Sequence, residues 1–356
     1  MGQQIAHVVG IKPWKRWQIN AFLKPLYSRV SFAGSARQAL NRQRAQGGDI
    51  VVWAAREADG LNELALAQGA RLLRMEDGFI RSVGLGSNHV GGASLALDDL
   101  GIYYDPRQPS RLERILQSDA FDSRLVERAS RLRKHLVSQR LTKYNIGHPQ
   151  QGIRLGGGRR RKVLVPGQVS NDASVRCGTT DVSTNLELLR AVRAGHPDAW
   201  VIYKPHPDTE AGTRPGQMRD LELRTLADEV VRGVSPVDLF DQIDEVHTMT
   251  SLLGFEALLR DVPVHVYGQP FYAGWGLTHD HNPCARRTRR LSKDELVAGA
   301  LLRYARYVHP ETLKPCEAED VLACLANKSP ASPEAQRSVL RRILRLGQGL
   351  YRSWKS

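Results

Sequence analysis

Short apolar runs alternate with stretches of helical periodicity along the first part of the chain. Asp49 to Ala54 (DIVVWA) is an apolar run of strand length, Gly60 to Gly69 predicts a short helix ending on glycine, and Arg71 to Met75 predicts the next strand. This order of strand, helix and strand is typical of a parallel sheet covered by helices. Ser110 to Arg140 follows as a long basic region of helical periodicity.

A second unit of the same kind follows a segment rich in Gly, Gln and Arg. That segment, residues 145–161, has no periodicity and predicts a linker. Its glycines do not indicate a phosphate loop, because no Lys-Ser or Lys-Thr closes them and they precede a strand. The strands predicted next are Lys162 to Pro166, Ala199 to Lys204, Glu245 to Met249 and Pro263 to Tyr267, and the helices are Thr184 to Ala194, Leu252 to Arg260, Leu291 to Tyr307 and Ala318 to Leu325.

We therefore expect an α/β protein with two Rossmann-like domains. Ligands bind at the carboxyl ends of parallel strands, so the site should lie in the cleft between the domains. A chain of 356 residues is long enough for two cores. The expected divisions are an N-terminal domain over 1–150, a second domain over 151–295, closing helices over 296–330 and a basic amphipathic tail over 331–356.

The composition adds a basic balance to this picture. The 51 Lys and Arg exceed the 37 Asp and Glu, and the net charge of +14 favours an anionic partner: nucleic acid, a membrane surface, or a phosphorylated and carboxylated substrate. The four cysteines form no CxxC pair and predict neither a disulfide framework nor a metal site. Because we find no signal peptide and no apolar run of membrane-spanning length, we expect a cytosolic protein or one bound to the cytosolic membrane face.

The first candidate for chemistry is the acidic segment Glu76-Asp77-Gly78-Phe79, which is followed by Arg81 and Ser82. Two adjacent carboxylates at a strand end point in different directions, so one should face the cleft. The Arg81 guanidinium can hold a carboxylate or a phosphate through two hydrogen bonds. The alternative is an ordinary turn in which an acidic residue caps a helix.

The second candidate is Lys204-Pro205-His206-Pro207, where prolines end a predicted strand. Lys204 and His206 would stand at the sheet edge, where an anionic leaving group can be bound and protonated. A purely structural histidine is the alternative.

The third candidate is Thr250-Ser251 at the start of a predicted helix, with Glu256 farther along it. Two hydroxyls at a helix start can cap the helix or bind phosphate. Glu256 would accept hydrogen bonds from ribose hydroxyls if a nucleotide occupied the cleft. Simple capping is the alternative.

The fourth candidate is the loop Gln269 to Asp280 (QPFYAGWGLTHD), which is rich in aromatic residues and glycine. It follows a predicted strand and so lies at the same sheet edge as the other candidates. Trp275 in this loop would form part of a pocket wall. The alternative is a packed loop that anchors the two domains.

Together these segments resemble one family, the bacterial capsule polysaccharide biosynthesis proteins that are retaining β-Kdo glycosyltransferases, where Kdo is an acidic eight-carbon sugar. The similar stretches follow the family order and span most of the chain. They are residues 76–87 (EDGFIRSVGLGS), 95–113 (LALDDLGIYYDPRQPSRLE), 143–145 (KYN), 163–175 (VLVPGQVSNDASV), 202–212 (IYKPHPDTEAG), 249–259 (MTSLLGFEALL) and 270–280 (PFYAGWGLTHD).

The resemblance implies a GT-B-like fold, a CMP-β-Kdo donor and transfer with retention of configuration. By the resemblance, Asp77 is the attacking carboxylate, with Glu76 as the second choice, and the domain over 151–295 binds the nucleotide sugar. It also implies that no metal or other cofactor holds the phosphate. The remaining implied contacts are Lys204, His206, Thr250 and Ser251 with the phosphate, Glu256 with the ribose, Arg81 with the sugar carboxylate, and Gln168 and Trp275 with the substrate.

The implied acceptor is a phospholipid-linked Kdo chain, and other capsule assembly proteins are further expected partners. Well-known members carry two such modules in tandem and this sequence carries one. Its PGQV at 166–169 also departs from modules that have Asp before the Gln. These departures leave the linkage and the acceptor open.

The last residues support an acceptor at a membrane. Residues 336–356 contain six basic residues and no acidic one, with apolar residues at helical spacing, which predicts a basic amphipathic helix for an anionic lipid surface. The segment 12–29 (KPWKRWQINAFLKPLYSR) is a second basic, aromatic stretch. We therefore expect a peripheral protein on the inner face of the inner membrane; a solvated or partner-binding tail is the alternative.

Three other functions remain as alternatives. A nucleic-acid-binding protein would explain the charge, but no recognised motif is present and the basic residues are spread along the chain, so we expect no nucleic-acid partner. Another CMP-sugar-dependent transferase of surface polysaccharide assembly is the enzymatic alternative. A non-catalytic partner of capsule export is the structural one.

Overall fold

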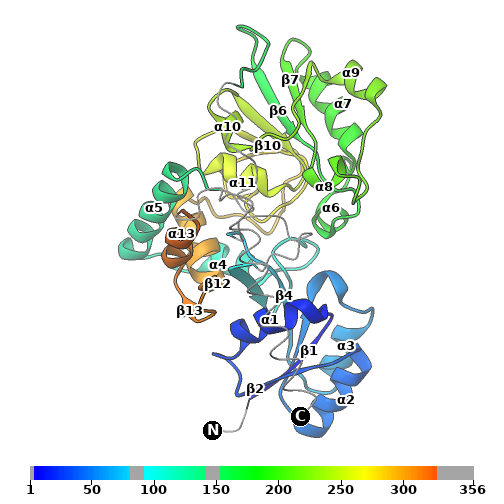
Figure 1. Cartoon of the computed structure of the whole chain (residues 1–356), viewed down its shortest axis with the longest axis vertical. Coiled ribbons are helices and arrows are strands. Elements are labelled where there is room, and N and C mark those ends of the chain that lie inside the picture. Colours follow the sequence, from blue (N-terminus) through cyan, green and yellow to red (C-terminus); the bar gives the residue numbers. More distant parts are fainter. Residues whose placement is uncertain (1–3, 81–91, 142–152, 327–356) are drawn as a thin grey trace.

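The chain builds two α/β units, which lie one above the other along the long axis of the molecule (Figure 1). The computed structural model describes residues 4–80, 92–141 and 153–326. Each unit has a central sheet: seven strands in the order β13-β12-β5-β4-β3-β1-β2 in the first, and six in the order β11-β10-β9-β6-β7-β8 in the second. The expected α/β class is confirmed.

The first sheet begins with four parallel strands: β1 (Ile5–Val9), β2 (Arg29–Phe32), β3 (Asp49–Trp53) and β4 (Leu72–Asp77). The elements between them are η1 (Pro13–Lys15), α1 (Arg16–Leu23), α2 (Ala36–Gln46), η2 (Ala54–Arg56) and α3 (Leu61–Ala67). Ile50, Val51 and Val52 are all fully buried, because helices cover both faces of the sheet. The next strand, β5 (Ser94–Asp98), runs antiparallel to β4. The sheet is therefore mixed, whereas the sequence pattern predicted a parallel sheet.

The long basic region after β5 forms two helices and not one. They are α4 (Arg111–Ser118) and α5 (Ser123–Ser138). Asp122 begins the second helix, because its carboxylate accepts a hydrogen bond from the Leu125 backbone N–H at 2.8 Å.

The second sheet is wholly parallel. Its strands are β6 (Lys162–Pro166), β7 (Trp200–Lys204), β8 (Glu229–Val230), β9 (Glu245–Thr248), β10 (Val264–Val266) and β11 (His279–Asp280). Its helices are α6 (Ala173–Gly178), α7 (Asn185–Gly195), α8 (Pro207–Glu210), α9 (Asp220–Leu226), α10 (Val237–Phe240) and α11 (Leu252–Leu258). The four strands predicted from apolar runs are confirmed to within a residue or two.

The chain then returns to the first sheet, where only closing helices were expected. After α12 (Lys293–Val297) and the π-helical η4 (Ala298–Tyr304), it forms β12 (Ala305–Val308), β13 (Pro315–Cys316) and α13 (Ala318–Ala326). β12 pairs antiparallel with β5, whose edge would otherwise be left open. The helix predicted over Leu291 to Tyr307 is therefore wrong in its last residues.

Two ion pairs join the units beside the returning chain. Arg286 and Arg287, which follow the second sheet, lie 2.7 and 3.1 Å from the carboxylate of Glu113 on α4. Across the described residues, no helix combines the length and the apolar character needed to cross a bilayer.

Candidate active site

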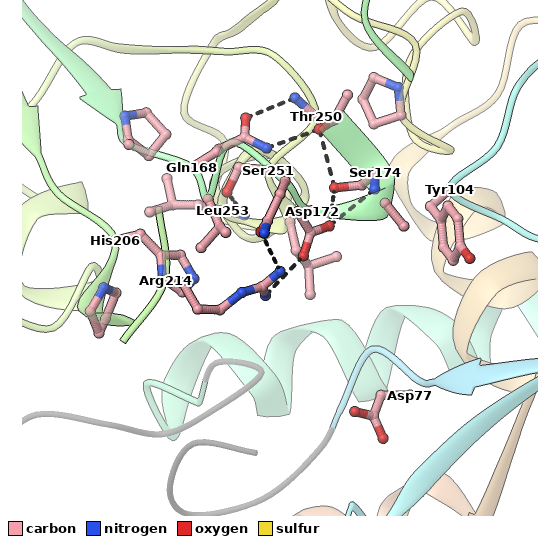
Figure 2. Close-up of a pocket in the computed structure, with 18 of the residues that line it drawn as sticks. Asp77, Tyr104, Gln168, Asp172, Ser174, His206, Arg214, Thr250, Ser251 and Leu253 are labelled. Atoms are coloured by element: carbon pink, nitrogen blue, oxygen red, sulfur yellow. Dashed lines mark hydrogen bonds and ion pairs between the residues drawn. The ribbon is translucent and has the colours of Figure 1, made fainter. Parts of the chain in front are cut away.

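The carboxyl ends of four strands of the second sheet meet at a cavity of about 620 Å³. The segments that follow β6, β7, β9 and β10 all line it. Glu76 and Asp77, at the end of β4 in the first sheet, also line it, and Figure 2 shows Asp77 across from the labelled polar groups of the second sheet. The cavity therefore lies between the units and has the size of a small-molecule site.

Gln168, just after β6, fixes the end of β9. Its Nε2 donates a hydrogen bond to Thr250 Oγ1 at 2.9 Å, and its Oε1 accepts one from the Thr250 backbone N–H at 3.0 Å. Its own backbone N–H donates to Asn185 Oδ1 at 2.9 Å. Gln168 lines the cavity as predicted, but its amide is engaged in holding Thr250 in place.

Thr250 and Ser251 both line the cavity and also serve the local structure. Ser251 Oγ accepts a hydrogen bond from the Leu253 backbone N–H at 3.2 Å and so caps α11. Thr250 Oγ1 donates to Ser174 Oγ at 3.4 Å (Figure 2). Capping is thus confirmed for Ser251, and it leaves both hydroxyls at the cavity wall together with Glu256 of α11.

Lys204, the last residue of β7, is a buried cation on the same wall. Its side chain is 5% exposed and lines the cavity. Burial lowers the pKa of its ammonium group, whereas the carboxylates of Glu210 and Glu256 act in the opposite direction. Its ammonium group makes no hydrogen bond with any residue of the described ranges, and a buried cation is costly unless an anion or another acceptor meets it.

His206 is the second basic group at the end of β7, and it caps the short helix α8. Its Nδ1 accepts a hydrogen bond from the Asp208 backbone N–H at 3.1 Å. Burial lowers the pKa of the imidazole, with the nearby Asp208 acting in the opposite direction. A neutral ring whose Nδ1 accepts a hydrogen bond carries its proton on Nε2, so His206 can donate one hydrogen bond to a ligand.

Asp77 forms an ion pair with Lys15, which follows β1. The Lys15 Nζ lies 3.2 Å from Asp77 Oδ1 and 3.4 Å from Oδ2. It also lies 4.0 Å from the centroid of the Trp53 ring. The Glu76 carboxylate accepts a hydrogen bond from the Asp77 backbone N–H at 3.1 Å. Lys15 belongs to the basic N-terminal stretch, but it faces the acidic segment and not the surface.

A smaller cavity of about 230 Å³ also borders these carboxylates. Glu76 and Asp77 line it together with Lys12, Trp14 and Arg56. β1, β3 and β4 are parallel, so the residues after each strand gather at one sheet edge. Glu76 and Asp77 therefore line two cavities, each with cationic groups.

Trp275 corrects the prediction made for the aromatic loop. It is fully buried and does not line either cavity, and its Nε1 donates to the Phe271 carbonyl at 2.8 Å. The indole is the largest apolar group of the loop, and its burial anchors the loop as a packed segment. Pro270 and Phe271 are the loop residues that line the large cavity, and Phe271 packs on Phe79 with ring centroids 4.5 Å apart.

Sequence reasoning assigned no role to several other polar residues of the large cavity, among them Asn171, Asp172 and Arg214. Arg214 lies 3.4 Å from the Asp172 carboxylate and donates to Asn171 Oδ1 at 3.0 Å (Figure 2). The NDAS pattern at 171–174 is a helix-capping signal that marked Asp172, which accepts from the Ser174 N–H at 3.0 Å. Arg214 follows α8 in a loop without periodicity and carries no such signal. Arg81 lies outside the described residues, and its role stays a prediction.

Comparison with known proteins places this architecture in a family. The sequence profile of the family described as capsule polysaccharide biosynthesis proteins matches residues 48–161 and 154–309. The chain is 40% identical over 352 residues to the capsule polysaccharide modification protein LipA of Neisseria meningitidis serogroup B. The aligned region covers 98% of this chain and 50% of LipA. It is 38% identical over 329 residues to the lipopolysaccharide-processing protein LpsZ of Rhizobium meliloti, with 91% of this chain and 74% of LpsZ covered.

Two solved structures from Thermosulfurimonas dismutans share the fold. The KpsC beta Kdo 2,7 transferase is 36% identical with a TM-score of 0.75, and covers 91% of this chain and 99% of that one. The KpsC beta Kdo 2,4 transferase is 31% identical with a TM-score of 0.78, and covers 92% and 98%. The chain spans about half the length of the LipA proteins it matches.

The profile match covers well over half of the chain, and LpsZ and both solved structures exceed 30% identity over most of their length. The family resemblance noted in the sequence is thereby confirmed. The chain belongs to the capsule polysaccharide biosynthesis protein family.

Proposed function

We propose that this protein is a β-Kdo glycosyltransferase of the GT-B type. It transfers Kdo from CMP-β-Kdo, with retention, to a lipid-linked acceptor in capsule polysaccharide synthesis. The observation that carries the proposal is the cavity in which two carboxylates of one sheet face the cations and hydroxyls of the other. The likeness to two Kdo transferases over nearly their whole solved chains supports the same function.

The wall formed by the second sheet suits the donor. The Lys204 ammonium and the His206 Nε2–H would bind the phosphate of CMP, with Thr250 and Ser251 as further donors. Glu256 would accept hydrogen bonds from the ribose hydroxyls. With these groups on the phosphate we expect transfer to proceed without an added divalent cation.

The acidic segment suits the chemical step. The Asp77 carboxylate would attack the anomeric carbon of Kdo while the bond from that carbon to the phosphate oxygen breaks, and CMP leaves with the electron pair. The acceptor hydroxyl would then attack the same carbon, lose its proton to a base and displace Asp77. Two inversions in sequence retain the configuration.

The smaller cavity suits an acidic acceptor. Lys12 and Arg56 there would bind the carboxylate of the terminal Kdo, and Trp14 provides an aromatic wall for a sugar ring. For the second inversion, the attacking hydroxyl must reach the anomeric carbon on the face that CMP has left, opposite to Asp77.

The direct test is incubation of the full chain with CMP-Kdo and a short Kdo-lipid acceptor, followed by NMR of the product. We expect CMP release and a new β-linked Kdo, whose linkage position the NMR spectrum defines. Cleavage of CMP-sialic acid with no cleavage of CMP-Kdo would contradict CMP-Kdo as the donor. Steep salt-dependent RNA binding without CMP release would contradict the proposal that the protein is an enzyme and would favour a nucleic-acid-binding protein.

The lipid-linked acceptor also implies a membrane location, on the inner face of the inner membrane. The basic stretch 336–356 supports this by its sequence and lies outside the described residues. We expect deletion of 336–356 to shift the protein out of the membrane fraction while cleavage of soluble CMP-Kdo is kept. Unchanged partitioning of the truncated protein between the membrane and soluble fractions would contradict this role.

A further inference from the structure

A group of histidines surrounds one buried carboxylate on the second sheet. Glu245 and His247 lie two residues apart on β9 and therefore share a sheet face. His265 of β10 is in register with His247, and His279 of β11 is in register with His265. His196, at the end of α7, lies against the same group with its ring 4.9 Å from that of His247. None of these side chains lines the large cavity.

Three of these side chains have the geometry of a metal site. One ligand atom from each of His196, Glu245 and His247 lies within 4.8 Å of the other two. His196 Nδ1 and His247 Nε2 lie 3.8 and 3.2 Å from the same oxygen, Glu245 Oε1. Tetrahedral Zn²⁺ with bonds of about 2.1 Å separates its ligand atoms by roughly 3.4 Å. The two imidazole planes meet at 82°, so their in-plane lone pairs can converge on one point.

The polar atoms at this point are buried and lack a hydrogen bond. Glu245 and His247 are both 0% exposed. Glu245 Oε1 and His247 Nε2 have no hydrogen-bond partner among the described residues, although they lie within ion-pair distance of each other. When the His247 proton lies on Nδ1, toward the Tyr267 hydroxyl, the buried Nε2 lone pair and the Glu245 oxygen repel each other, and a cation between them would satisfy both.

The neighbouring groups orient these ligands from behind. Arg161 and His265 contact the other carboxylate oxygen, Glu245 Oε2, with His265 Nε2 at 3.4 Å. His247 Nδ1 lies 3.3 Å from the Tyr267 hydroxyl, so a hydrogen bond there directs the Nε2 lone pair toward Glu245.

We propose that His196, Glu245 and His247 bind one Zn²⁺ ion, with a fourth coordination position open to solvent beside His196. Two imidazoles and one carboxylate are a ligand set that suits zinc. The His196 side chain is 24% exposed, so the ion has a path from solvent. His265 stacks on His247 with planes only 4° apart, so its lone pair cannot meet the same ion and it acts as a positioning residue. The metal would fasten the end of α7 to β9.

The first test is zinc titration of the full chain after it has been stripped with EDTA. We expect one equivalent of Zn²⁺ by calorimetry and by elemental analysis of the dialysed protein. His196→Ala and Glu245→Gln should each weaken binding at least tenfold, and Tyr267→Phe about tenfold through the His247 ring. The matched control is His135→Ala, which removes an exposed imidazole on α5 and should change nothing. Wild-type affinity in both His196→Ala and Glu245→Gln would overturn the site.

Two further measurements address folding and the free cysteines. His196 lies at a helix end and is partly exposed, so its alanine variant should fold; Zn²⁺ should raise the melting temperature of the wild type and not of His196→Ala. With Co²⁺ in place of Zn²⁺, we expect visible bands of a nitrogen and oxygen site. A thiolate-to-cobalt charge-transfer band would instead place the metal on cysteine and overturn the proposal.

Discussion

The two walls of the large cavity are built differently. On the wall from the second sheet, polar groups come from the ends of several strands and hydrogen bonds join them, as Gln168 joins the segments after β6 and β9. On the wall from the first sheet, two carboxylates come from one strand end, and Asp77 is held by the ammonium of Lys15. The first arrangement resists displacement, whereas an ion pair can exchange its partner.

This difference suggests that one wall binds the donor and the other carries out the chemical step. A braced wall that presents a buried ammonium and a neutral imidazole is suited to hold an anion in one position. A carboxylate on a separate wall, which borders two cavities, is suited to react with what is held there. Changes to the two walls should therefore have different consequences for binding and for transfer.

The largest effect should follow from Asp77→Asn. The amide cannot form a glycosyl ester, so transfer should fall by at least about 1,000-fold. The affinity for CMP should stay within about twofold, because the wall from the second sheet, here called the donor wall, is unchanged. Single-turnover assays with CMP-Kdo and calorimetry with CMP measure the two quantities. The companion variant is Glu76→Gln, which should retain more transfer. Full transfer in Asp77→Asn would exclude Asp77 as the nucleophile, and loss of transfer in Glu76→Gln alone would assign that role to Glu76.

The next effect should come from Lys204→Met on the donor wall. Met keeps the length and burial of the side chain but removes the charge. Charge-assisted hydrogen bonds are worth about 1.5–3 kcal/mol, so kcat/KM for CMP-Kdo should fall roughly 10- to 150-fold. CMP affinity should fall with it, which separates this variant from Asp77→Asn. Lys134→Met, which removes an exposed charge on α5, serves as the control. If Lys204→Met lowered transfer and left CMP affinity intact, the two walls would not divide their roles in this way.

Much of the donor wall could be predicted from the sequence. β6 and β7 are covered on both faces and form continuous apolar runs, and the prolines after Lys204 mark where the strand ends. The order of strands and helices is therefore enough to place the candidates at the ends of β7 and β9 on one sheet edge. Trp275 was placed wrongly because a large aromatic residue in a loop suits a pocket wall and a packed anchor equally well.

The parts that escaped prediction depend on contacts between distant residues. Lys15 and Asp77 are 62 positions apart, and neither side chain signals the other in the sequence. β12 is extended because β5 needs a partner, although the residues before it have helical periodicity. The group of His196, Glu245 and His247 likewise arises only when the end of α7 reaches β9.

A smaller effect should follow from Gln168→Ala, which tests whether the donor wall is braced. The Thr250 backbone N–H and hydroxyl would lose their buried partner, so the free energy of unfolding should fall by about 1–3 kcal/mol. KM for CMP-Kdo should rise several-fold, because Thr250 is no longer fixed, while kcat changes less. Chemical denaturation and steady-state assays measure the two effects. A variant with unchanged stability and unchanged KM would show that this wall holds its shape without Gln168.

The smallest effect concerns pH and His206. Its pKa in the folded protein lies below the ordinary value of 6.5, so the unfolded chain binds the proton more readily and acid weakens the fold. The stability that this group contributes is complete above about pH 6.5 and is lost as the pH falls toward the folded pKa. His206→Asn keeps an oxygen that can cap α8 and has no group that titrates there. Denaturation at several pH values should show the wild type losing stability relative to His206→Asn below about pH 6.5, by about 1.4 kcal/mol for each unit of pKa depression. A constant difference between the two proteins down to pH 4.5 would mean that the His206 pKa is not lowered in the fold, and the cavity would then present a second cation to CMP only below about pH 6.5.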